Sequence, residues 1–178
     1  MTIAGFGRVP PLSTEPVTTA RLLLPLFSDD DVRAMLDGRR LPGWDAGYPR
    51  EDDVDIARHL AGSPAPGEAE RRWSPRHIVR RDTGRAVGSI GFFGAPGGDR
   101  TVEIGYGLVE TSWGRGLASE AVAALVASAE ETGEVDLVIA HTLADNEPSQ
   151  RVLLKNGFHG AGVNDDGERR FERRTPNG

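Results

Sequence analysis

The 178-residue sequence contains no cysteine, which excludes disulfide bonds, a thiolate nucleophile and cysteine-based zinc sites. Its four histidines are scattered without metal-ligand spacing, so we expect no bound metal. No apolar run is long enough to span a bilayer, and the N-terminus lacks the apolar core of a signal peptide. These absences predict a cytoplasmic protein that does not bind membranes.

An excess of positive charge is also absent. The net charge of -6 argues against nucleic-acid binding, which depends on basic side chains that neutralise phosphates. A hydrophobic content of 38% and a charged content of 27% are ordinary for a soluble globular protein. The length predicts one domain over residues 1–178. We expect a monomer or a homodimer, and the sequence favours neither. Residues 1–17 are expected to form a loose arm because prolines interrupt them.

The pattern of apolar residues predicts an α+β fold. Three consecutive strands between residues 76 and 109 predict an antiparallel meander, and a strand–helix–strand crossover at 101–142 should be right-handed with parallel strands. The last strand, RRFERR, is expected at a solvated sheet edge. Strands are predicted at 19–27, twice within 76–94, and at 101–109, 135–143, 158–162 and 168–173, with helices at 28–36, 51–62, 117–133 and 147–157.

A glycine-rich segment, WGRGLASEA, separates the strand at 101–109 from the long helix that follows. Bare main chain at a helix N-terminus forms an anion site, and Arg115 between Gly114 and Gly116 adds a positive side chain. The same glycines would also serve a tight turn without a ligand. No Gly-Lys-[Ser/Thr] triplet is present, which excludes a nucleoside-triphosphate loop. A dinucleotide-binding domain is a distant alternative, because Gly114, Gly116 and Ser119 approximate that fingerprint but follow an antiparallel meander.

The chain resembles the GNAT superfamily of acetyl-coenzyme-A-dependent N-acetyltransferases, in particular the branch of ribosomal-protein N-terminal acetyltransferases. Five segments in the family's order carry the resemblance: RLLLPL, TGRAVGSIGFF, EIGYGLV, WGRGLASEA and NEPSQRVLLKNGF. The family's signature, [Gln/Arg]-x-x-Gly-x-[Gly/Ala], is matched at Gly116 and Ala118, whereas Trp113 departs from its first position. The resemblance implies a mixed, mostly antiparallel sheet with helices on both faces and a V-shaped cofactor cleft between two central parallel strands.

The resemblance also implies a binding site for acetyl-coenzyme A, with coenzyme A as the product. The strand before the glycine loop would offer main-chain groups to the pantetheine arm, the loop would surround the pyrophosphate, and an Asn-x-x-Ser pair would face the coenzyme. The hydroxyl of Ser149 would return a proton to the leaving thiolate, and Asn146 could also be a plain helix cap. The implied cofactor-binding residues are Tyr106, Gly107, Leu108, Val109, Gly114, Arg115, Gly116, Leu117, Ala118, Ser119, Asn146 and Ser149.

Acetyl transfer to an amine needs a group that accepts the amine proton. Glu103 is the first candidate because it interrupts an apolar strand on the same face as Gly105 and Gly107. A cross-strand ion pair with an arginine is its structural alternative. His141, in the neighbouring parallel strand, is the second candidate because histidine exchanges protons near neutral pH, although it could also be a core residue. The candidate catalytic residues are therefore Glu103 and Ser149.

In proteins that this chain resembles, the loop at 37–49 often lines the acceptor pocket, so the resemblance implies that the acceptor lies near this loop. This loop is expected to expose Trp44 and Tyr48, whose rings could stack on an acceptor or could equally pin the loop to the core. The candidate substrate-binding residues are Trp44, Asp45, Tyr48 and His141. The predicted reaction is direct transfer of an acetyl group to a primary amine, either a protein N-terminus or a small molecule. A non-catalytic sensor or scaffold that binds acyl-coenzyme A is the alternative.

Overall fold

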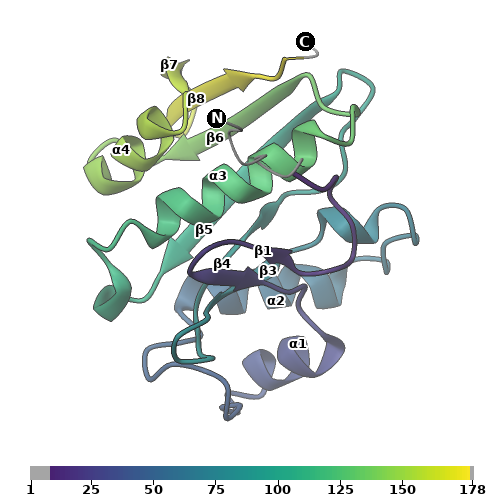
Figure 1. The fold of residues 1–178 in the computed structure, drawn as a ribbon, viewed down its shortest axis with the longest axis vertical. Coiled ribbons are helices and arrows are strands. Elements are labelled where there is room, and N and C mark those ends of the chain that lie inside the picture. Colours follow the sequence, from purple (N-terminus) through teal and green to yellow (C-terminus); the bar gives the residue numbers. More distant parts are fainter. Residues whose placement is uncertain (1–8, 177–178) are drawn as a thin grey trace, which may run out of the picture.

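The computed structural model describes residues 9–176, and in this part of the chain eight strands form one sheet (Figure 1). They are β1 (Val17–Thr18), β2 (Leu22–Leu24), β3 (Arg76–Arg80), β4 (Ala86–Phe92), β5 (Thr101–Leu108), β6 (Leu137–Thr142), β7 (His159–Val163) and β8 (Arg169–Arg174). Their order in the sheet is β1-β2-β3-β4-β5-β6-β8-β7. Neighbouring strands are antiparallel except β5 and β6, which are parallel.

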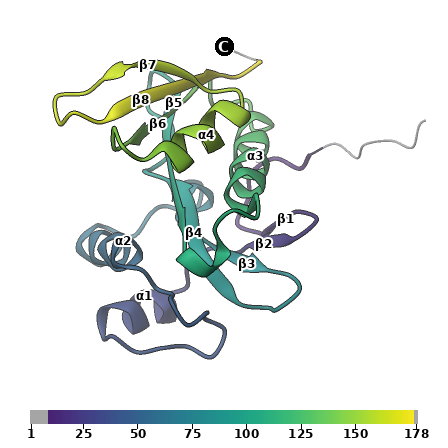
Figure 2. The same cartoon turned by 90° about the vertical axis from the view of Figure 1, so that its left-hand side faces the viewer.

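The helices cover both faces of this sheet, with α1 and α2 on one side and α3 and α4 on the other (Figure 2). Helix α1 begins where Ser28 and Asp31 form a reciprocal capping box. Buried apolar residues recur along α3 at helical spacing and pack on the sheet. The helices are α1 (Asp29–Leu36), α2 (Glu51–Gly62), α3 (Leu117–Glu130) and α4 (Glu147–Lys155), with two short 3-10 turns, η1 (Arg71–Trp73) and η2 (Glu110–Ser112).

The two parallel strands separate soon after they pair. Their register covers three residue pairs and ends at Glu103 opposite Ile139, whereas β5 continues to Leu108 and β6 to Thr142. The edge of β5 that faces β6 therefore has no strand partner beyond Glu103 within the described chain. The α+β fold and the V-shaped opening between two central parallel strands are thus confirmed.

The sequence prediction places the last strand wrongly. Strand β8 lies between β6 and β7, so β7 rather than RRFERR forms the edge of the sheet. Phe171 of β8 is buried, whereas Arg170 and Glu172, which point to the opposite face, form an ion pair at 2.8 Å. Arg173, on the same face as Phe171, pairs with Glu130 of α3, so the charged residues have partners on both faces of an interior strand and do not indicate an edge.

The N-terminal arm is also different from the prediction. Residues 1–8 lie outside the described residues, but from residue 9 onward the arm is held against the fold. Leu12 is buried, and its backbone N–H donates to the carbonyl of Ser128 at 2.8 Å. The Arg76 guanidinium donates to the carbonyl of Glu15 at 3.0 Å. The prediction of a loose segment is therefore wrong for residues 9–17.

Candidate active site

Glu103 and His141 meet where the parallel strands separate. The Oε1 atom of Glu103 lies 2.8 Å from Nδ1 of His141, and their side chains are 33% and 17% exposed. With the Nδ1–H tautomer of the imidazole, this geometry lets the ring donate to the carboxylate and leaves Nε2 as an acceptor. Glu103 is therefore paired with His141 and not with an arginine of the meander, and the two candidate bases form one unit, here called the Glu103–His141 pair.

The face of β5 that carries Glu103 also carries Gly105 and Gly107, and both glycines have close neighbours. A Cβ atom at Gly105 would lie 3.0 Å from the ring of Phe93, a side chain that is 74% exposed. At Gly107 a side chain would overlap the guanidinium of Arg50, which packs there from the start of α2. The absence of side chains at these two positions makes room for Phe93 and Arg50 beside the Glu103–His141 pair.

Arg50 is held in place by a buried carboxylate. Its Nη2 atom lies 2.7 Å from Oδ1 of Asp53, whose side chain is fully buried, and the hydroxyl of Ser89 donates to the same carboxylate. Neither residue was singled out from the sequence, because an arginine and an aspartate at the start of an acidic helix resemble ordinary surface charges. The glycines at alternate positions of β5 are the sequence feature that could have indicated that another side chain packs against this strand.

Ser149 lies on the other side of β5, next to Tyr106. The phenol of Tyr106 donates to the Ser149 carbonyl at 3.0 Å, and the two side-chain oxygens lie 2.9 Å apart. Burial raises the pKa of Tyr106 to about 12, so the phenol stays neutral near pH 7. The Oδ1 atom of Asn146 accepts from the Ser149 backbone N–H at 3.2 Å, which confirms that Asn146 caps α4. A role for Asn146 toward the coenzyme stays a prediction.

The glycine loop adopts the conformation that its sequence requires. Gly114 and Gly116 have φ angles of 70° and 74°, in the left-handed region that disfavours other residues. Gly116 is the N-cap of α3, so the first N–H groups of the helix follow it directly. Arg115 between them is exposed, whereas the side chain of Leu117 is buried. The tight turn is therefore confirmed, and contact with a pyrophosphate stays a prediction.

Part of the main chain before this loop already has partners. The indole N–H of Trp113 donates to the carbonyl of Leu108 at 2.8 Å, and the N–H of Val109 donates to the carbonyl of Val87 at 2.8 Å. The register against β4 turns the main-chain groups of Gly107 toward Ser89, so any main-chain pairing with a pantetheine arm would fall on Tyr106 and on the N–H of Leu108. Trp113, which departs from the family signature, anchors the loop to the end of β5.

The rings of the loop at 37–49 are buried. Trp44 is 4% exposed and Tyr48 is 0% exposed, and the Tyr48 hydroxyl lies 2.7 Å from Nδ1 of His77 on β3. The prediction that these rings are exposed is wrong, and the alternative that they pin the loop to the core is confirmed. The Asp45 side chain is half-buried, and its backbone N–H donates to the carbonyl of Ala86. Trp44 and Tyr48 therefore cannot stack on an acceptor in this conformation.

Two broader features of the described chain bear on function. No group of three or more histidine, aspartate or glutamate side chains among residues 9–176 is placed to hold a metal ion. Over the same residues, no helix is long and apolar enough to cross a membrane.

A family model described as an acetyltransferase (GNAT) domain matches residues 21–159. The chain belongs to the GNAT acetyltransferase family. The uncharacterized N-acetyltransferase YoaA of Bacillus subtilis is 38% identical over 148 residues, which cover 82% of this chain and 83% of that protein. The ribosomal-protein-serine acetyltransferase of Escherichia coli is 36% identical over 72 residues, 40% of each chain.

Solved structures of GNAT proteins share the fold. The ribosomal L7/L12 alpha-N-protein acetyltransferase RimL, in complex with coenzyme A, matches with a TM-score of 0.67 and 18% identity over 92% of this chain and 100% of that one. A GNAT-family acetyltransferase from Bordetella pertussis matches with a TM-score of 0.62 and 26% identity over 89% and 99%. Family membership makes this protein an acetyl-coenzyme-A-dependent acyltransferase.

Proposed function

We propose that this GNAT protein transfers the acetyl group directly to a primary amine and that the Glu103–His141 pair accepts the amine proton. The observation that carries this proposal is the 2.8 Å contact between the two side chains where β5 and β6 separate. An alkyl ammonium group must lose a proton before its nitrogen can attack, and a carboxylate joined to an imidazole is suited to receive it. No cysteine is available for a covalent route.

The residues of the opening fit acetyl-coenzyme A. The left-handed Gly114 and Gly116 present bare main chain at the start of α3, where an anion is favoured by the N–H groups and the helix dipole. The unpaired edge of β5 offers the main-chain groups of Tyr106 and the N–H of Leu108 to the pantetheine arm. When bound, acetyl-coenzyme A supplies the acetyl group as a thioester. Loop residues 114–119 would hold its pyrophosphate.

The groups that we propose for the two proton transfers lie on opposite faces of β5. Glu103 and His141 lie on the face that α2 covers in part, so they can take the proton of an amine that approaches from that side. Ser149 lies on the face of α4, where its hydroxyl can donate a proton to the leaving thiolate. Tyr106 positions that hydroxyl through the 2.9 Å contact between the two side-chain oxygens.

The proposal is tested by two measurements on the full chain. Calorimetric titration with acetyl-coenzyme A measures binding, and thiol release across a panel of small amines and N-terminal peptides measures transfer. We expect binding below millimolar concentration and thiol release with at least one class of primary amine. Absence of binding near millimolar concentration would overturn the coenzyme site, whereas binding without thiol release from any amine would favour a sensor or scaffold.

A further inference from the structure

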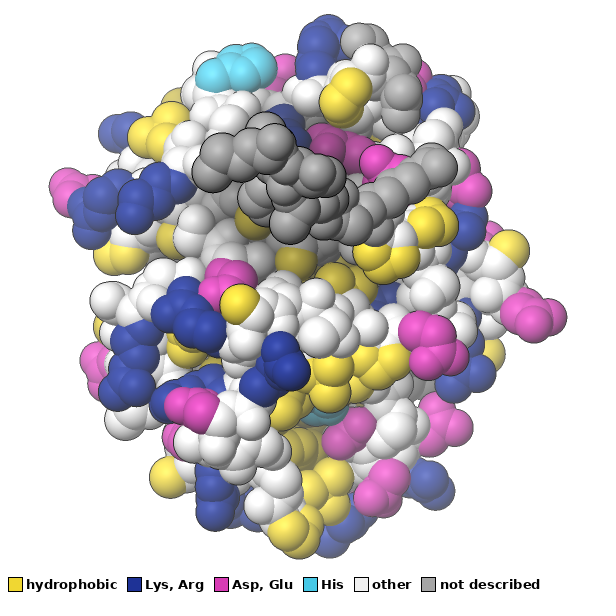
Figure 3. Space-filling model, viewed as in Figure 1, with side chains coloured by type: hydrophobic (Ala, Val, Ile, Leu, Met, Phe, Trp, Pro, Cys, Tyr) yellow, Lys and Arg dark blue, Asp and Glu magenta, His cyan; other side chains and the backbone are white. Residues whose placement is uncertain are grey.

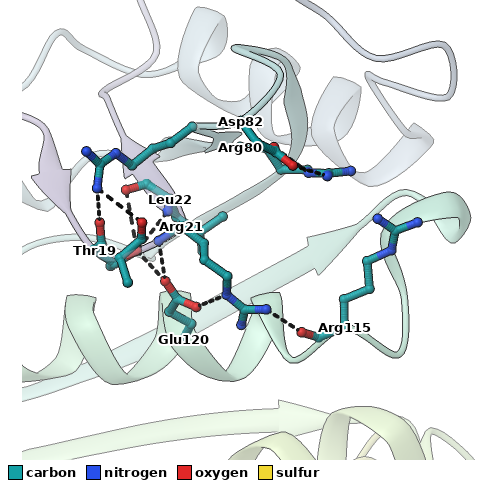
Figure 4. Close-up of polar contacts among 9 residues, drawn as sticks. Thr19, Arg21, Leu22, Arg80, Asp82, Arg115 and Glu120 are labelled. Carbon is teal, nitrogen blue, oxygen red and sulfur yellow. Dashed lines mark hydrogen bonds and ion pairs between the residues drawn. The ribbon is translucent and has the colours of Figure 1, made fainter.

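Arginine side chains from three segments line a cavity of about 290 Å³ beside the glycine loop (Figure 4). Arg21 precedes β2, Arg80 ends β3 and Arg81 follows it, and Arg115 lies within the loop. Asp82 and Leu117 also line this cavity, here called the arginine pocket. In the space-filling view, Lys and Arg side chains gather on the left of the molecule below its middle (Figure 3).

Two of the arginines are fixed by contacts with the start of α3 and with the N-terminal strands. The Nε atom of Arg21 donates to Glu120 at 2.6 Å, and its Nη1 atom donates to the carbonyl of Arg115 at 2.8 Å. The Nη1 atom of Arg81 donates to the carbonyl of Thr19 at 2.8 Å. Side chains held in this way lose little conformational freedom when a ligand binds.

The other two arginines, Arg80 and Arg115, also line the pocket. Nε of Arg80 donates to Asp82 at 3.0 Å, so this carboxylate is neutralised by its own partner. The Arg115 side chain extends toward the Arg80–Asp82 pair (Figure 4). Among residues 9–176, no hydrogen bond or ion pair engages the Arg115 guanidinium, so all its donors face solvent or a ligand.

The charge of the pocket contrasts with the charge of the chain. Four guanidinium groups and the Asp82 carboxylate line it, although the whole sequence carries a net charge of -6. Because Arg21 pairs with Glu120 and Arg80 with Asp82, Arg81 and Arg115 supply its excess positive charge. The planar guanidinium matches the geometry of phosphate oxygens and can bond to two of them at once. A concentrated basic pocket in an acidic protein therefore indicates a compact anionic group such as a phosphomonoester.

We propose that the arginine pocket binds the 3′-phosphate on the ribose of coenzyme A. This inference rests on the proposed coenzyme site, because Arg115 and Leu117 belong both to the loop expected to hold the pyrophosphate and to the pocket. In coenzyme A only the ribose separates these two phosphate groups. A phosphomonoester is close to doubly charged at pH 7.5, since its second ionisation falls near pH 6. The pocket thus makes the protein selective for coenzyme A over its 3′-dephospho form.

The test compares coenzyme A with 3′-dephospho-coenzyme A by calorimetric titration of the full chain at pH 7.5. We expect the wild type to bind coenzyme A at least ~10-fold more tightly, because hydrogen bonds to a charged group contribute on this scale. Arg80→Gln and Arg81→Gln should each reduce this ratio severalfold and leave the affinity for the dephospho form within about twofold. The ratio should also fall as salt is raised, because the pocket opens to solvent.

Arg58→Gln is the matched control. Arg58 is exposed on α2 and forms an ion pair with Asp55. Its substitution therefore removes one positive charge and leaves one aspartate unpaired, as Arg80→Gln does, but at a site away from the pocket. This variant should keep the wild-type ratio. A wild-type ratio near one, or a ratio that neither pocket variant changes, would overturn the inference but leave the coenzyme site intact. Failure of both ligands to bind would overturn the coenzyme site and this inference together.

Discussion

The carboxylate of Glu103 and the imidazole of His141 are joined at 2.8 Å across two parallel strands that separate immediately beyond them. The register places Glu103 opposite Ile139, so His141 reaches back by two residues along β6. A hydrogen-bonded pair of this kind acts as a unit, because each side chain sets the orientation and charge of the other. Substitutions of the two residues should therefore not have independent effects.

Glu103→Gln should lower kcat by about 10²- to 10⁴-fold, the usual contribution of general acid–base catalysis. Glutamine keeps a hydrogen-bonding group beside His141 but cannot accept the proton or stabilise an imidazolium. The acidic limb of the pH–rate profile should flatten, whereas the affinity for acetyl-coenzyme A should stay within about twofold of the wild type. Thiol-release kinetics from pH 5 to 9 and calorimetric titration measure these effects.

The double variant Glu103→Gln, His141→Gln tests whether the pair works as one unit. We expect it to lose about as much activity as the more damaging single variant, because residues that act together are not additive. Glu172→Gln is the control, since Glu172 lies on the same face of the sheet but pairs with Arg170 on β8. Losses that multiply in the double variant, or an equal loss in the control, would contradict the proposed pair.

Ser149→Ala should lower kcat by about 10-fold or less, whereas Glu103→Gln should lower it by about 10²- to 10⁴-fold. The effect at Ser149 is smaller because a thiolate is a good leaving group and water can supply its proton. Tyr106→Phe should have an intermediate effect, since it removes the phenol that lies 2.9 Å from the Ser149 hydroxyl. Ser63→Ala on the far end of α2 serves as the control hydroxyl. A loss for Ser149→Ala as large as that for Glu103→Gln would make Ser149 an indispensable acid.

Local patterns were sufficient to predict most of the fold. The strand–helix–strand crossover and the glycine turn depend on residues close in sequence, and both are present with small shifts at their ends. The position of RRFERR was not predictable in the same way, because strand order depends on how the final hairpin packs on β6. The charges of Arg170 and Glu172 indicate that one face of that strand is open to solvent, but they do not indicate which strands lie beside it.

The sequence indicated individual residues of the candidate site but not the contacts between them. Glu103 and His141 were found separately, but their contact depends on the register of β5 against β6, which no local pattern encodes. Trp44 and Tyr48 looked exposed because their loop is rich in glycine and proline, whereas their burial depends partly on His77 from a distant strand. The arginine pocket was missed for the same reason, since three separate segments form it.

Gly116→Val should weaken binding of coenzyme A by at least ~10-fold. A branched side chain would stand where the phosphate is expected to approach the main chain, and the left-handed φ of 74° would no longer be favoured. Gly133→Val is a matched control, because Gly133 has a φ of 70° beyond the opposite end of α3. Both variants should lose roughly 1–2 kcal/mol of unfolding free energy from backbone strain. Equal losses of coenzyme affinity in the two would assign the effect to strain alone.

Asp31 should make the fold sensitive to acid. Its carboxylate lies 3.2 Å from Nε2 of His77 and accepts from the Ser28 backbone N–H at 2.7 Å. Burial raises the pKa of Asp31, but the contact with the His77 imidazole and the hydrogen bonds with Ser28 outweigh it and lower the pKa from 3.8 to about 2. The pKa of Asp31 is lower in the folded state than in the unfolded state. The ionised carboxylate therefore stabilises the fold fully above pH 3.8, and this contribution to the free energy of unfolding is lost as the pH falls through 2.

The expected loss is about 2 kcal/mol of unfolding free energy between pH 5 and pH 2, from 1.36 kcal/mol for each unit of pKa difference. Urea denaturation of the wild type and of Asp31→Asn across this range measures it as the difference between the two curves. Asp29→Asn is the control, because Asp29 is an exposed aspartate in the same helical turn. The difference in unfolding free energy between the wild type and Asp31→Asn should shrink toward pH 2. The same difference between the wild type and Asp29→Asn should change by less than about 0.5 kcal/mol, the usual range for surface substitutions. A constant difference between the wild type and Asp31→Asn from pH 5 to pH 2 would show that the contacts of Asp31 do not depend on its charge.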